Sequence, residues 1–143
     1  MSTIVSATTS AMRGGNGASK KQRLVVNAEY LLAESSKSLQ AGDQVCAFDY
    51  AYQASLRLAG ARIAESPVAK RVRKPSGAWD QLRMVDAQAA QWADVFQPYS
   101  QTHRRMISGL SHTMTAERIL AFQYKVWEFH AELTGMQEGP VAA

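Results

Sequence analysis

The sequence predicts an all-α fold, an antiparallel bundle of four main helices with one short extra helix between them. Apolar residues recur at steps of three and four in four separate segments, which is the repeat of one helix face. No segment alternates between apolar and polar residues as a half-buried strand does. Glycine, proline and cap-forming residues separate the segments. At 143 residues the chain is long enough to enclose a single core.

The first helix is expected over residues 21–41, and Lys20 and Lys21 either open it or precede it. Its apolar stripe, widened by two neighbours, consists of Leu24, Ala28, Leu31, Ser35 and Leu39 with Val25 and Leu32. Gly42 is suited to end this helix, and Asp43 is suited to cap the next one. A junction this short predicts that the two helices lie side by side and antiparallel.

The second helix, residues 43–65, is expected to be the centre of the bundle. Its stripe consists of Val45, Phe48, Tyr52, Leu56, Ala59 and Ile63. Further alanines between these positions would let neighbouring helices approach closely. Cys46 is the single cysteine, which excludes an intramolecular disulfide and a cysteine-based zinc site. We expect Cys46 to be a buried, inert thiol.

A third helix is expected from Ser76, a plausible N-cap, to Pro98, which should end it. Its stripe consists of Trp79, Leu82, Val85, Ala89, Trp92 and Phe96. Residues 98–114 are the least regular part of the body. They have room for a short helix over residues 100–108, broken by Gly109.

The last helix is expected over residues 115–134, with Gly135 as its stop. Its core stripe consists of Ile119, Phe122, Val126, Phe129 and Leu133. A second apolar strip lies on another side and consists of Leu120, Tyr124 and Trp127. A terminal helix with two apolar faces usually buries one against its own bundle and one against a partner. The second strip therefore predicts a homodimer interface.

The chain divides into a disordered tail over residues 1–19, a helical bundle over residues 20–135 and a C-terminal tail over residues 136–143. All of the net charge of +4 lies in residues 1–23, and the remaining basic and acidic residues balance. The high isoelectric point is therefore no argument for nucleic-acid binding by the bundle. No apolar run is long enough to span a membrane. The first residues lack the apolar core of a secretory signal, so we expect a cytoplasmic protein. Their acid-free composition also resembles a transit peptide, which is the minor alternative.

The strongest local charge of the body follows the central helix, where four cations occupy five positions before a Pro-Ser-Gly turn. They are Lys70, Arg71, Arg73 and Lys74. One interpretation is a solvated loop, and the other is contact with the phosphates of a nucleic acid. Arg104 and its neighbour Arg105 would join this loop if the turn after Pro98 lay at the same end of the bundle.

Three stretches resemble the HEPN family, small helical bundles that are widespread in prokaryotes. The stretch from residue 42 reads GDQVCAFDYAYQASLRLAGARIA and resembles the second HEPN helix. The next two read RKPSGAWDQL and QAAQWADVF, and resemble an actinobacterial HEPN subfamily. The likeness covers residues 24–134. It implies either a metal-independent ribonuclease, with an Arg, four to six residues and a His forming one composite site across a homodimer, or a non-catalytic domain that binds nucleotides, nucleic acid or protein.

Arg105 and His112 are the catalytic candidates, because the six residues between them meet that spacing. A histidine can transfer protons at a ribose hydroxyl, and an arginine can stabilise charge developing on phosphorus. Met106 stands where the family favours a polar residue, and Gly109 interrupts the segment. The alternative pair Lys125 and His130 has lysine where the family requires arginine, and we expect His130 at a core boundary.

His103, beside Arg104 and Arg105, is expected to belong to a solvated polar cluster. The three histidines lack a metal-ligand pattern, so no metal and no cofactor are expected.

These observations favour a non-catalytic, homodimeric HEPN-like binding domain that contacts RNA or another nucleic acid through its basic loop. One alternative is a toxin-like ribonuclease that uses Arg105 and His112 across the dimer. Another is a structural module whose last helix binds a protein partner. A ribonuclease would lose RNA cleavage on His112→Ala while remaining folded.

Overall fold

The computed structural model describes residues 18–110 and 114–135, and within them every regular element is a helix. The elements in chain order are α2 (Lys20–Gln40), α3 (Gln44–Ala64), the single-turn 3-10 helix η1 (Pro67–Lys70), α4 (Ala78–Arg83), α5 (Ala87–Phe96), α6 (Pro98–Ile107) and α7 (Ala116–Thr134). The described part of the chain has no strand, which confirms the all-α class.

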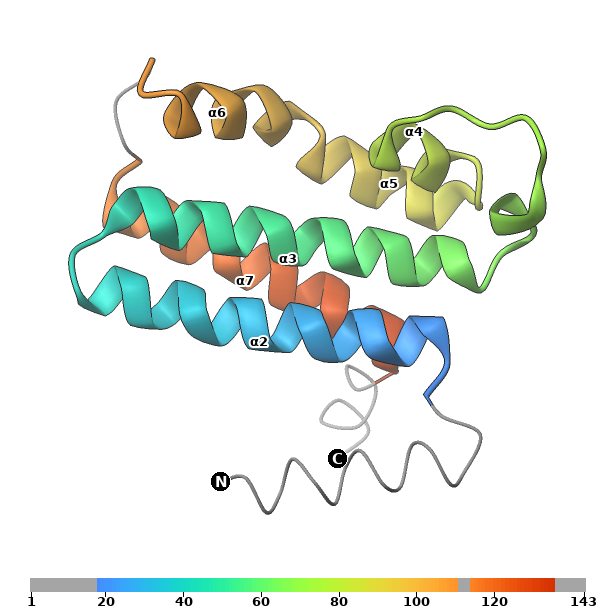
Figure 1. Ribbon diagram of the computed structural model, residues 1–143, viewed down its shortest axis with the longest axis horizontal. Coiled ribbons are helices and arrows are strands. Elements are labelled where there is room, and N and C mark those ends of the chain that lie inside the picture. Colours follow the sequence, from blue (N-terminus) through green and yellow to red (C-terminus); the bar gives the residue numbers. More distant parts are fainter. Residues whose placement is uncertain (1–17, 111–113, 136–143) are drawn as a thin grey trace.

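The helices alternate in direction around α3 (Figure 1). Helix α2 runs antiparallel to α3 along one side, as the short junction predicted. Helices α5 and α6 follow one another as a single bent rod on the other side, and α7 returns behind α3. Counted in this way, the four main helices are α2, α3, the α5–α6 rod and α7, which agrees with the predicted bundle.

Helix α3 is buried on almost every side because its neighbours contact different faces of it. Helices α2, α4, α6 and α7 all pack against it. Its fully buried alanines lie on these faces and are Ala47, Ala51, Ala54, Ala59 and Ala61. A side chain of one methyl group lets a neighbouring backbone approach closely. The expected stripe is therefore only part of the buried surface, and Val45 and Leu56 lie at its edge.

A buried hydrogen-bond chain joins three of the helices. The Ser35 hydroxyl in α2 donates to the Ala47 carbonyl oxygen in α3 at 2.6 Å. The Gln123 amide in α7 donates to the Ser35 hydroxyl oxygen at 2.7 Å. Ser35 is wholly buried and Gln123 nearly so, and each has a partner for its polar group. The chain fixes the lengthwise position of α2 and α7 relative to α3, since sliding either helix would break a bond in the core.

Aromatic rings fill the space between α3, the α5–α6 rod and α7. Phe48 of α3 lies 5.0 Å from Phe122 of α7, measured between ring centroids. Phe96 of α5 lies 5.8 Å from Phe122 and 5.5 Å from Trp79 of α4. These rings are nearly or fully inaccessible to water, and they form the centre of the single core.

The predicted helix ends between α2 and α3 are confirmed. Gly42 has φ of 81°, a left-handed conformation that most other residues avoid. The Asp43 carboxylate accepts a hydrogen bond from the Cys46 backbone N–H at 3.0 Å and so caps α3. The last helix likewise begins after its cap Thr115 and ends at Gly135. At the start of α2, Ser19 and Gln22 form a capping box, so both lysines lie inside the helix.

The third predicted helix is wrong as a continuous element. Helix α4 ends at Arg83, and Asp86 caps a separate helix α5 by accepting from the Ala89 N–H at 2.8 Å. Asp86 also pairs with Arg62 of α3, so its carboxylate is engaged at the break in the helix. Ser76 is not the cap of α4, because Gly77 occupies that position without a side-chain bond.

Pro98 begins α6 rather than ending the rod. A proline is tolerated at the first position of a helix because its missing N–H would be unpaired there in any case. Gln97 before it has helical angles, so the chain direction changes little between α5 and α6. The short helix predicted over residues 100–108 is confirmed as α6.

Replacing Ser35 with alanine should lower the free energy of unfolding by about 1–3 kcal/mol, because the buried Gln123 amide loses its acceptor. The adjacent Ser36 is exposed, and Ser36→Ala should change stability by less than about 0.5 kcal/mol. Urea unfolding followed by far-UV circular dichroism measures both values. Equal stabilities of the two variants would contradict a structural role for the chain.

Candidate functional site

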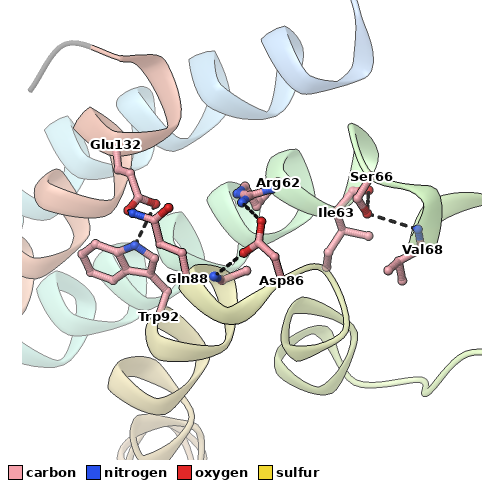
Figure 2. Close-up of polar contacts among 9 residues, drawn as sticks. Arg62, Ile63, Ser66, Val68, Asp86, Gln88, Trp92 and Glu132 are labelled. Carbon is pink, nitrogen blue, oxygen red and sulfur yellow. Dashed lines mark hydrogen bonds and ion pairs between the residues drawn. The ribbon is translucent and has the colours of Figure 1, made fainter. Parts of the chain in front are cut away.

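The four cations of the predicted basic loop lie between α3 and α4, at the end of the bundle where α3 finishes. The Ser66 hydroxyl accepts from the Val68 N–H at 3.2 Å and donates to the Ile63 carbonyl at 2.8 Å, which turns the chain out of α3 (Figure 2). Val68 is buried and anchors the turn. Beyond it the chain extends into solvent, and Val72 is 99% exposed.

All four loop cations, Lys70, Arg71, Arg73 and Lys74, are exposed. Within the described residues none of them forms an ion pair with a carboxylate. Lys74 donates instead to the Ala69 carbonyl oxygen at 2.9 Å, which folds its side chain back along the loop. The loop therefore presents positive charge that no described acid neutralises.

A hollow of about 350 Å³ lies beside this loop and adds a fifth cation. Lys20, from the first turn of α2, lines one side of it, and Lys74 lines another. Gly60 and Ala64 of α3 also line it, and their small size leaves the space open. Among the described residues, no carboxylate lines this hollow. Sequence analysis left open whether Lys20 opens the first helix or precedes it, and it did not place Lys20 beside the loop, because nothing local shows that α2 begins where α3 ends.

Two other cations at the same end are neutralised, whereas Arg23 donates to the Ala18 carbonyl oxygen at 2.6 Å. Lys21 lies 3.1 Å from a Glu65 carboxylate oxygen, and Arg62 lies 2.6 Å from Asp86 (Figure 2). Asp86 accepts hydrogen bonds from the Ala89 backbone N–H and from the Arg62 side chain. These two bonds, in that order of importance, hold the pKa of the Asp86 carboxyl below its usual range. We use the term basic end for the unneutralised set, Lys20, Lys70, Arg71, Arg73 and Lys74.

Arg104 does not join the basic end. Helix α6 packs against the beginning of α3, whereas the loop follows the end of α3, so the two lie at opposite ends of the bundle (Figure 1). The turn after Pro98 is therefore not at the same end of the bundle as the basic loop, and Arg104 and Arg105 do not extend the loop's positive surface. Arg105 is exposed near Arg104, and its guanidinium donates to the Leu110 carbonyl oxygen at 3.4 Å. His112 lies outside the described residues, so its relation to Arg105 stays a prediction.

His103 is not part of a solvated cluster, contrary to expectation. Its Nε2 lies 2.7 Å from an Asp49 carboxylate oxygen, and its ring stacks on Tyr52 with centroids 4.5 Å apart. The Tyr52 hydroxyl in turn accepts from the Trp79 indole N–H at 3.0 Å, and burial raises its pKa. The network links α3, α4 and α6 and positions helices. The sequence gives one sign of this network: Asp49 and Tyr52 lie one turn apart on α3 and can therefore face the same neighbour.

His130 is buried in α7, and its Nε2 lies 2.6 Å from a Glu29 carboxylate oxygen of α2. Lys125 is exposed and lies 3.6 Å from Glu128. The two residues therefore face different surroundings and do not form a joint Lys–His site.

The second apolar strip of α7 is exposed. Leu120, Tyr124 and Trp127 are 55%, 65% and 43% accessible, respectively. Two further exposed apolar side chains, Val26 and Tyr30, lie on α2, on either side of the glutamate that bonds His130. Sequence analysis missed these two because they fall outside the core stripe of α2.

Over residues 18–110 and 114–135, no group of three histidine, cysteine or acidic side chains is arranged to hold a metal ion. In the same part of the chain, no helix combines the length and apolar character needed to cross a bilayer.

The model of the SAV_6107-like HEPN family matches residues 38–134, more than half of the chain. The match begins near the end of α2 and runs through α7, so it includes the basic loop and the α7 strip. No curated protein and no solved structure matches the chain.

Cys46 is exposed, not buried as expected, because it lies on the solvent side of the first turn of α3, whereas the next two residues, Ala47 and Phe48, are fully buried. It should nevertheless react slowly. A hydrogen bond to the Asp43 carboxylate, with desolvation second, raises the pKa of the thiol. The thiolate is the reactive form, so a raised pKa moves the reaction to higher pH.

Asp43→Asn should accelerate alkylation of Cys46 by iodoacetamide severalfold at mildly alkaline pH, because it removes the negative charge beside the thiol. Asparagine remains a good N-cap, so α3 should stay intact. The pH–rate profile should shift to lower pH than that of the unchanged protein, and circular dichroism provides the folding control. Superimposable profiles would contradict this role of Asp43.

Proposed function

Because the chain belongs to the SAV_6107-like HEPN family, we propose that it is a non-catalytic HEPN domain that binds nucleic acid at its basic end. The observation that supports this most directly is the set of exposed, unneutralised cations around the 350 Å³ hollow. Phosphate groups are the anions that such a cluster attracts most strongly, whatever the base sequence.

The arrangement favours backbone contact over base recognition. The aromatic rings nearest the basic end, such as Trp79, are buried in the core and offer no stacking surface. The described part of the chain has no exposed histidine there, and His130 is bonded to Glu29. Contact with four or five phosphates would give a log–log salt slope of about −3 to −4.

Replacing Lys70, Arg71, Arg73 and Lys74 together with alanine should abolish most of the affinity for a short single-stranded RNA and flatten the salt slope towards zero. The matched control replaces Arg104 and Arg105 at the opposite end and should keep both affinity and slope. Fluorescence anisotropy at several salt concentrations measures the effect. Unchanged binding by the loop variant would contradict the proposal. RNA recovered shortened, and left intact by His112→Ala, would favour the ribonuclease alternative.

We further propose that the α7 strip forms a homodimer interface together with Val26 and Tyr30 of α2. Large apolar side chains exposed in a contiguous group are uncommon on monomeric proteins, and covering them removes apolar surface from water. The Glu29–His130 bond holds α2 and α7 together beneath this surface, so both helices can present it as one rigid unit.

Leu120→Glu should convert the dimer to a monomer, because it places a charge in the apolar contact. Ile107→Glu on α6 is the control, since Ile107 is similarly exposed but lies on another helix. Sedimentation velocity at several protein concentrations distinguishes the two states. A monomer before any substitution, or a dimer that survives Leu120→Glu, would refute this interface.

A further inference from the structure

A groove of about 380 Å³ lies between α5 and α7, away from the basic loop. Three aromatic side chains and two carboxylates line it together with one alanine, and these residues are Trp92, Tyr124, Trp127, Glu128, Ala131 and Glu132. Sequence analysis separated these residues, because it assigned Trp92 to the core and Tyr124 and Trp127 to an interface. A homodimer formed through Tyr124 and Trp127 would cover one wall of this groove, so a ligand bound here would compete with dimerisation.

The spacing of the residues on α7 explains why they gather. All of them except Trp92 belong to α7, at steps of three and four that place them on one side of the helix. Ala131 is the small member, and its short side chain leaves the space that the larger residues surround. Trp92 forms the opposite wall from α5.

Glu132 is fixed in position by neutral donors. The Trp92 indole N–H donates to one carboxylate oxygen at 2.8 Å, and the Gln88 amide donates to the other (Figure 2). Within the described residues Glu132 has no ion pair. Lys21 and Arg62, which line a separate pocket together with Glu132, are each bonded to another acid. The groove therefore has a negative charge that is oriented but not neutralised.

The aromatic walls are held in place from behind. The Trp92 ring stacks on Phe129 with centroids 4.9 Å apart and on Phe96 at 5.8 Å. The Trp127 ring contacts the edge of His130 at 5.1 Å. Donation of the Trp92 N–H to a carboxylate polarises the indole and enriches its face in electrons. Trp92 is thus both fixed and electron-rich, and Trp127 adds a second indole to the lining of the groove.

We propose that this groove binds a small organic cation with a methylated ammonium head, a ligand of which choline is the simplest example. Electron-rich rings attract such cations, and tryptophan does so most strongly. Both oxygens of Glu132 already accept hydrogen bonds. Glu132 can therefore attract a cation by its charge, but it is less able to accept further hydrogen bonds from a ligand. A methylated head requires charge and no acceptor. The volume is at the low end for ligand sites and suits a small molecule.

The first experiment titrates the full-length protein with choline chloride in a calorimeter, at constant ionic strength. The control ligand is the uncharged tert-butyl analogue, in which carbon replaces nitrogen. We expect saturable binding of choline, and binding of the analogue weaker by about tenfold or more, because only the charge differs. Equal binding of the two ligands, or no binding of choline, would overturn the proposal. A peptide containing trimethyl-lysine tests the other source of this head group, and tighter binding than choline would identify a protein-borne ligand.

Two substitutions assign the binding to this groove. Glu132→Gln retains an acceptor for the Trp92 N–H but removes the charge, and Trp127→Ala removes one wall. Each should weaken choline binding by about three- to thirtyfold. The matched control is Glu117→Gln, an exposed acid in the first turn of α7, which should bind as the unchanged protein does. Circular dichroism melts verify folding. Unchanged choline binding by Glu132→Gln would contradict the assigned role of its charge.

Discussion

The close packing of helices around α3 is the constraint on which the rest of the molecule depends. Its buried alanines leave room for neighbouring helices on several faces, and the Gln123–Ser35–Ala47 hydrogen-bond chain sets their lengthwise position. Since α3 is almost entirely enclosed, little of its own surface is left for contact with other molecules. Such contacts must use the ends of the bundle and the outer faces of the surrounding helices.

That arrangement separates positive charge from aromatic surface. The loop after α3 and the first turn of α2 bring unneutralised cations to one end. The outer side of α7 instead presents exposed rings beside two carboxylates. The two surfaces have opposite electrostatic character and belong to different helices. A polyanion and a small cation would therefore not compete for the same residues, and either surface can be altered without changing the other.

The sequence predicts best those features that depend on residues close together in the chain. The Gly42–Asp43 junction, the limits of α7 and the exposure of its second strip are all local, and the structure agrees with them. The family resemblance was also recognisable from short stretches, and residues 38–134 match that family. Features that depend on distant partners were missed.

His103 and Asp49 are 54 residues apart, and no local pattern indicates that they meet. The break before Asp86 depends likewise on Arg62 of another helix. A continuous apolar stripe across residues 79–96 concealed this break, because the two short helices keep nearly the same repeat. Cys46 was misplaced for a different reason. It is next to the core stripe in sequence but lies on the solvent side of the helix, while Ala47 and Phe48 after it are fully buried.

The junction at Pro98 has a consequence for how evenly the fold resists opening. Proline has no N–H, so the backbone hydrogen-bond ladder is interrupted where α5 passes into α6. Beyond that point Met106 is the one buried side chain of α6, all of which the structure describes, and the His103–Asp49 bond is a polar link from α6 to α3. A segment with so few buried contacts has a low free energy of local unfolding. Amide hydrogens of α6 should therefore exchange with solvent well before those of α3, through openings that leave the other helices folded.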